Sequence, residues 1–242
     1  MDSYPSQHGH QHAAYPPQLS KLEVLGYITD CGIGLAEIHY NHACERLTIK
    51  RFDGTLDNGL LFGANEPKVG SFSTLIEGPF AYLWGEYNGH IILARTCQQE
   101  PSTRDLYEFW NGTDYVKDYT SAGPMSAFDD IPKGAIIRSN LFGKHKKYVF
   151  VGVSKWCDSL IRVGAAEGSE GPWEIWPVAM TQGINKTDGF RYCIYPHMFA
   201  SHTRNAELMV TWSEQWPGGV FAGRVKFLTE ELVCEEECEL ID

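Results

Sequence analysis

The chain has 242 residues with a formal net charge of −11, and 43% of the residues are hydrophobic. That apolar fraction is enough for a buried core, which argues against a chain that is disordered throughout. The acidic balance counts against a nucleic-acid surface, because phosphate binding needs clustered Lys and Arg. No apolar run approaches the roughly 20 residues of a membrane helix. We therefore expect neither a nucleic acid nor a membrane as partner.

The N-terminal residues 1–20 are rich in His, Gln, Pro and Ser, and predict a flexible tail ahead of one domain at 21–242. No apolar stretch of the signal-peptide kind follows Met1. If this N-terminus is native, we expect a cytoplasmic protein whose seven cysteines are reduced thiols. If a signal peptide was removed, the protein is expected to be secreted.

Short apolar runs bounded by turn residues fill the chain from Lys21 onward, with almost no helical periodicity. Residues 21–40 predict two short strands, and residues 44–52 alternate as a third. Residues 60–70 are ambiguous. Four strands follow within 80–116, where Asn88-Gly89 and Asn111-Gly112 are hairpin turn signals. These runs predict antiparallel sheets joined by tight turns.

The stretch 136–176 carries the clearest repeat of this pattern, with four consecutive strands. A third copy occupies about 190–227 and has three strands, so the N-terminal segment is expected to supply a fourth. The first strands of the copies align at 81, 136 and 194, at spacings slightly above those of common propeller repeats but compatible with four strands and long connectors. The pattern predicts an all-β β-propeller of four to five four-stranded antiparallel blades. A β-sandwich with irregular loops is the alternative.

Two stretches, at 136–176 and 195–216, resemble a group of uncharacterised fungal proteins. Their fold is similar to the five-bladed propellers of arabinanases and related furanosidases. The resemblance rests on Gly171-Pro172-Trp173-Glu174 after the third strand of one blade and on Tyr195-Pro196-His197 in the next. It implies five blades, a hydrolase-like function, and an Asp on the first inner strand at the position of Asp30. A more distant resemblance is to fungal cyclases of natural-product pathways that work without a cofactor.

Inner strands line the central channel of a propeller, and ligands bind at its mouth. Glycoside hydrolysis needs two carboxyl groups on either side of the scissile bond. We expect Asp30 to act as the base and Glu86 as the acid, with His197 as a third catalytic candidate. Each carboxylate could instead be a turn or surface residue, and His197 could be a hydrogen-bonded core residue.

The remaining candidates are rings and charged groups that could hold a substrate. Arg138 lies inside an apolar strand, where it either pairs with a carboxylate or clamps an anionic or carbonyl group. The tryptophans could stack on a ligand or pack between blades. The substrate-binding candidates are Trp84, Arg138, Trp156, Asp158, Tyr195 and Trp212. We expect no cofactor and no metal, because no nucleotide or metal motif is present.

Three functions remain open. The first is a glycosidase-like hydrolase that takes a carbohydrate or another small molecule. The second is a cofactor-free cyclase that holds an apolar substrate in the channel. The third is a binding protein without catalysis. The oligomeric state cannot be inferred.

Overall fold

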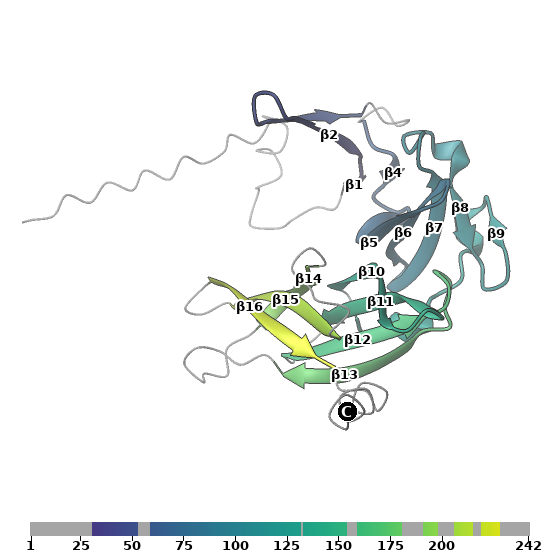
Figure 1. Ribbon diagram of the computed structural model, residues 1–242. Helices are drawn as coiled ribbons and strands as arrows, with labels where there is room; N and C mark the ends of the chain where they lie inside the picture. Colours follow the sequence, from purple (N-terminus) through teal and green to yellow (C-terminus); the bar gives the residue numbers. More distant parts are fainter. Residues whose placement is uncertain are drawn as a thin grey trace, which may run out of the picture. The chain divides into compact units, whose positions relative to one another are not determined.

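The computed structural model describes residues 31–52, 59–131, 133–153, 159–180, 191–197, 206–214 and 219–227 (Figure 1). From Gly32 onward these residues belong to one compact unit. They form sixteen strands, β1 to β16, in five antiparallel sheets, with three 3₁₀ turns as their helical elements. No helix in these ranges has the length and apolarity needed to cross a membrane. The predicted all-β class is confirmed.

The largest sheet has five strands in the order β5-β6-β7-β8-β9. Its strands are β5 (Lys68–Glu77), β6 (Phe80–Tyr87), β7 (His90–Cys97), β8 (Glu108–Trp110) and β9 (Tyr115–Val116). The 3₁₀ turns η1 (Arg104–Leu106), η2 (Tyr119–Ser121) and η3 (Ser126–Phe128) lie in the connections around it. The four strands predicted at 80–116 are present.

The second sheet is the four-stranded meander β10-β11-β12-β13, which confirms the predicted blade. Its strands are β10 (Lys133–Phe142), β11 (Lys146–Val153), β12 (Leu160–Ala166) and β13 (Glu174–Met180). The third sheet has the strands β14 (Arg191–Pro196), β15 (Glu207–Glu214) and β16 (Gly219–Lys226). β10 lies against both β5 and β14, so the three sheets pack in chain order through their first strands.

Two small sheets come from the start of the described chain. β1 (Gly32–Ile33) pairs with β4 (Phe62–Gly63), and β2 (Ala36–Asn41) pairs with β3 (Arg46–Arg51). No described strand of this region joins the sheet of β14 to β16, so the predicted fourth strand from the N-terminal segment is not seen there. The described sheets do not close into a ring.

Three buried clusters hold the sheets together, because alternate residues of a strand point to opposite faces. Phe150 and Ile136 face the five-stranded sheet, in a cluster that includes Trp84 and Leu93. Val149, on the other face of β11, packs in a cluster with residues of β14 and β15. A third cluster covers the far face of the five-stranded sheet. The first sheet therefore packs on the second and the second on the third, as successive propeller blades do.

The alignment of first strands is wrong for one copy. β5, and not the strand at 81, is the first strand of its sheet and the one that contacts β10. Glu86 and Trp84 therefore lie on the second strand, β6, and not on an inner strand. The prediction missed β5 because Gly70 (φ +80°) and a run of Ser and Thr interrupt its apolar pattern.

Candidate functional site

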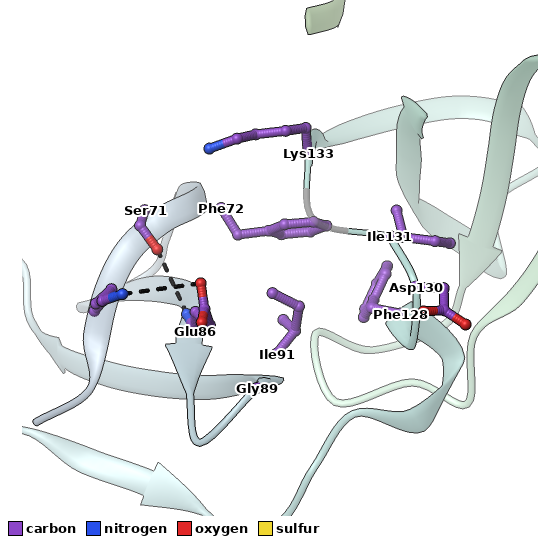
Figure 2. A pocket seen from close by; sticks show the side chains of 10 residues that line it. Ser71, Phe72, Glu86, Gly89, Ile91, Phe128, Asp130, Ile131 and Lys133 are labelled. Carbon is purple, nitrogen blue, oxygen red and sulfur yellow. Dashed lines mark hydrogen bonds and ion pairs between the residues drawn. The ribbon is translucent and has the colours of Figure 1, made fainter. Parts of the chain in front are cut away.

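A pocket of about 360 Å³ opens between the five-stranded sheet and the connector that leads into β10 (Figure 2). One wall comes from β5, β6 and the turn to β7, and the other comes from η3 and the residues after it. Five of the lining side chains are polar or charged and four are apolar. They belong to Lys68, Ser71, Phe72, Glu86, Ile91, Phe128, Asp130, Ile131 and Lys133, with Gly89 at the turn.

A bulge in β5 shapes the β5–β6 side of this pocket. Lys68 pairs with Glu86, but the next partner in register is Ser73 with Trp84, so four residues of β5 face one residue of β6. The single residue is Gly85, where a Cβ would lie 2.0 Å from the carbonyl oxygen of Lys68. Bulges bend a strand and redirect its side chains. This one brings Ser71 and Phe72 to the pocket.

Glu86 is held at the pocket edge by its two neighbours from β5. Its backbone N–H donates to Ser71 Oγ at 3.4 Å, and its Oε2 lies 4.0 Å from Lys68 Nζ. The Glu86 side chain is 54% exposed. Its carboxylate therefore has one loose ion pair inside the described residues and stays open to solvent and to a ligand (Figure 2).

The apolar wall belongs to the core between the sheets and is rigid for that reason. Phe72, Ile91, Phe128 and Ile131 are all buried members of one cluster. The rings of Phe72 and Phe128 are 5.3 Å apart, a favourable aromatic contact. The Met125 N–H donates to the Ile91 carbonyl at 2.8 Å and ties the connector to β7. A ligand would thus find a preformed apolar surface.

Charged groups lie at both ends of the pocket. Figure 2 shows Glu86 and Asp130 at opposite ends, with Ile91 and Phe128 between them. It also shows Lys133 extended along the rim above Phe72. Asp129, next to Asp130, has its Oδ1 3.3 Å from His90 Nδ1. This contact joins the connector to the start of β7. This arrangement can bind a ring compound through its apolar face and its polar substituents.

Of the predicted site residues, Glu86 alone among those described lines this pocket. Trp84, two residues earlier, is fully buried in the core between sheets. Its indole N–H has no hydrogen-bond partner in the described part of the chain. Trp84 is thus a packing residue, so its predicted role in stacking on a ligand does not fit its position.

Arg138 pairs with a carboxylate, which was one of the two expectations for it. Its Nη1 lies 3.1 Å from Glu77 Oε1, at the end of β5. Lys147 Nζ binds the same oxygen at 3.0 Å, and the Tyr148 hydroxyl donates to Glu77 Oε2. This cluster joins the first sheet to the second and lies outside the pocket lining.

His197 and Tyr195 lie together at the end of β14. Their rings meet edge to face at 5.6 Å, and His197 Nε2 is 2.8 Å from Thr211 Oγ1. Trp212, on β15, stacks on Phe221 with ring centroids 6.2 Å apart. None of the three lines the pocket at Glu86. The expected grouping of His197 with Glu86 is therefore not found.

Three predicted site residues, Asp30, Trp156 and Asp158, lie outside the described residues. Their roles stay predictions, and the Asp30–Glu86 pair stays untested. Within the described ranges no three His, Cys, Asp or Glu side chains gather as metal ligands would.

The sequence did not predict most of the pocket residues, which are Lys68, Ser71, Phe72, Ile91, Phe128, Asp130, Ile131 and Lys133. The connector had no strand or helix pattern, and its contact with β7 joins residues far apart in the chain. The only local signal was Gly70-Ser71, where a glycine breaks an alternating strand pattern and so indicates a bulge.

Comparison with known proteins yields likenesses in structure only. No family model and no curated protein matches the sequence. An inferred hydrolase from Bacteroides ovatus has a TM-score of 0.46 and 12% identity, over 75% of this chain and 53% of that one. A thermostable family-43 glycoside hydrolase has a TM-score of 0.37 and 10% identity, over 69% and 50%.

A third similar structure is a family-43 glycoside hydrolase engineered to show both endo-xylanase and exo-arabinofuranosidase activity. Its TM-score is 0.35 and its identity 8%, over 82% of this chain and 46% of that one. The chain thus spans about half the length of the structures it matches. No residue of the pocket is assigned from them.

Proposed function

We propose that this protein binds a small hydroxylated ring compound, of the sugar class, in the pocket beside Glu86. The observation that carries the proposal is the position of Glu86 at the edge of a preformed pocket, with its carboxylate more than half exposed. A carboxylate accepts hydrogen bonds from ligand hydroxyls, and Ser71 offers a further donor and acceptor. The ring face would rest on the accessible parts of Phe72, Ile91 and Ile131, because Phe128 is only 1% exposed.

Hydrolysis of a glycoside is the finer form of this proposal. Glu86 would act as the acid, and the second carboxyl group would come from the opposite end of the pocket, at Asp130. Retaining enzymes hold the two carboxyls about 5–5.5 Å apart, and inverting enzymes about 6.5–9.5 Å. The separation of the Glu86 and Asp130 carboxyl groups in a ligand-bound crystal structure would decide between the two geometries.

A cofactor-free cyclase is the second candidate, and one observation favours it. Four of the lining side chains, Phe72, Ile91, Phe128 and Ile131, are buried apolar residues of a single cluster. Such a wall can hold an apolar substrate in a reactive conformation. Simple binding without catalysis is the third candidate.

Isothermal titration with two panels of compounds tests the proposal. One panel contains neutral monosaccharides and their methyl glycosides, and the other contains apolar ring compounds without hydroxyl groups. We expect the first panel to bind, and Glu86→Gln to weaken binding about tenfold through loss of a charged hydrogen bond. Glu100→Gln, in an exposed turn, is the matched control and should bind as the wild type does.

Binding of the apolar panel alone, unchanged in Glu86→Gln, would replace the sugar proposal with the cyclase candidate. Sugar binding that Glu86→Gln leaves intact would place the site elsewhere. Hydrolysis of aryl glycosides by the wild type, lost in Glu86→Gln and in Asp130→Asn, would support the finer proposal.

A further inference from the structure

We infer that the ligand carries a carboxylate or another anionic group, which the ammonium of Lys133 binds at the rim of the pocket. This inference rests on the proposed function and narrows its substrate class from hydroxylated rings to acidic ones, such as sugar acids. The inference rests on which charged groups around the pocket have a partner of opposite charge and which do not.

The carboxylate at the β6 side of the pocket already has a cation beside it. Glu86 has Lys68 at 4.0 Å and its own N–H on Ser71. Asp129 is engaged with His90 at 3.3 Å. An anion that enters the pocket therefore meets a partly compensated negative charge at Glu86 and a second carboxylate, Asp130, only at the far end (Figure 2).

Lys133 is different, because no described carboxylate lies within ion-pair distance of it. Four other lysines in these sheets and their connections each have a glutamate partner: Lys68, Lys117, Lys146 and Lys147. In Figure 2 the Lys133 side chain instead extends along the rim toward the side of the pocket where Ser71 lies. Lys133 is exposed, so its ammonium is open to an anion that arrives from solvent.

The backbone fixes this lysine where it is. Lys133 opens β10 and pairs in register with Val153, and the next pair is Gly134 with Gly152. A Cβ at Gly134 would lie 2.2 Å from the ring of Phe150, and a Cβ at Gly152 would lie 2.4 Å from it. The two glycines thus let β10 and β11 pair across the buried Phe150 ring, and the start of β10 is held against the core. The backbone of Lys133 is thus fixed, and its side chain is exposed.

The apolar, hydrogen-bonding and cationic side chains of the pocket are therefore arranged to suit a ring compound that carries an acidic group. Ring atoms would lie on the accessible part of Phe72. Hydroxyl groups would reach Glu86 and Ser71, and the acidic group would reach Lys133. Lysine binds such a group as a point charge, which suits carboxylates at varied angles.

Two matched pairs of compounds test this inference: glucose with glucuronate, and benzyl alcohol with benzoate. Affinities are measured by titration for the wild type, for Lys133→Met, and for Lys50→Met as a control at an exposed position on β3. We expect the acid of each pair to bind about tenfold more tightly than the neutral compound. Lys133→Met should remove that preference, Lys50→Met should keep it, and added salt should reduce it.

The outcomes separate this inference from the proposed function. Equal affinity of acid and neutral compound, with binding still weakened in Glu86→Gln, would overturn the inference and leave the proposed function standing. A preference for acids that survives Lys133→Met would also overturn it, because the anion would then bind elsewhere. No binding by any of the four compounds would count against both.

Discussion

Two glutamates near β5 have opposite surroundings and therefore opposite roles. Glu66, just before β5, accepts two hydrogen bonds from Arg104 and one of 2.7 Å from the Gly63 N–H. Arg104 also donates to the Leu61 carbonyl at 2.9 Å. Glu86 has only a long contact with Lys68. The saturated pair is structural, and the open carboxylate is the one available to a ligand.

The Glu66 pair makes stability depend on pH. The hydrogen bond from Arg104, helped by the Gly63 N–H and opposed by burial, lowers the pKa of Glu66 from 4.5 to about 2. Because the folded pKa is below the unfolded one, the stabilisation is complete above about pH 4.5. It is lost as the pH falls toward 2. We expect Glu66→Gln to lower the free energy of unfolding at pH 7 by about 2–3 kcal/mol.

Urea unfolding at several pH values checks this expectation. The difference between wild type and Glu66→Gln should shrink between pH 4.5 and 2. Glu174→Gln is the control, because its pair with Lys146 at 2.7 Å is exposed and should be worth less than about 1 kcal/mol. If the difference in free energy of unfolding between wild type and Glu66→Gln stays constant with pH, the Glu66–Arg104 pair does not cause the pH dependence.

Residue identity alone could predict only part of these roles. A carboxylate partner for Arg138 was expected if the residue was buried; Glu77 is that partner, although the Arg138 side chain is 54% exposed. The depth of Trp84 was not predictable, because a tryptophan in a strand suits both a ligand wall and a core. Only the pairing of β6 with β5 and the packing of the next sheet decide between them.

At the level of single elements, the bulge between β5 and β6 links the fold to the pocket. Gly85 allows the carbonyl of Lys68 to approach, so Gly85→Ala would force β5 away from β6. We expect a loss of about 1–3 kcal/mol in the free energy of unfolding. Binding at Glu86 should weaken in parallel, because Lys68 and Ser71 move with β5. Chemical unfolding and titration of the folded variant measure the two effects, and an unchanged stability would contradict this close contact.

The junction at Glu77 ties the five-stranded sheet to its neighbour. Glu77 is mostly buried and binds Arg138, Lys147 and Tyr148 of the second sheet. Glu77→Ala leaves two cations and a hydroxyl without their acceptor, so we expect a loss of about 2–4 kcal/mol in the free energy of unfolding. Denaturant titration checks it, with Glu100→Ala as the surface control. A change below 0.5 kcal/mol, roughly the level of surface substitutions, would show that the junction contributes little.

Strands with regular alternation and clear turns were predictable, as the sheet of β10 to β13 and the strands β6 to β9 show. β5 was not, because its bulge breaks the two-residue period on which the prediction depends. That omission moved the inner-strand assignment to β6 and placed Glu86 and Trp84 on the wrong strand. The irregular strand β5 lines the pocket, and its bulge is the reason that the sequence pattern did not predict it.

At the scale of the whole described unit, burial is concentrated between the three stacked sheets. Leu93 in the core is fully buried, whereas Ile49 on the β2–β3 hairpin is 70% exposed. Ile38, its partner across the hairpin, is 65% exposed. We expect Leu93→Ala to cost about 2–5 kcal/mol and Ile49→Ala to stay within about 0.5 kcal/mol. Thermal and urea unfolding compare the two. Equal losses would show that the hairpin face is buried in solution.

The order of the sheets follows the chain, so the class of fold could be predicted from repeated strand patterns. The pocket could not, because it joins the bulge of β5 to the connector 126–133, which has no strand pattern of its own. Long-range packing at Phe72, Phe128 and Phe150 brings these segments together. Contacts of this kind join residues that are far apart in the chain, so they produce no periodic pattern of apolar residues in the sequence.

A crystal structure of the protein with its tightest-binding compound from the titration panels would test the proposed site most directly. We expect the compound to lie on Phe72, with a hydroxyl group within hydrogen-bond distance of the Glu86 carboxylate. A compound bound at His197 and Tyr195, with the pocket at Glu86 unchanged, would contradict this expectation.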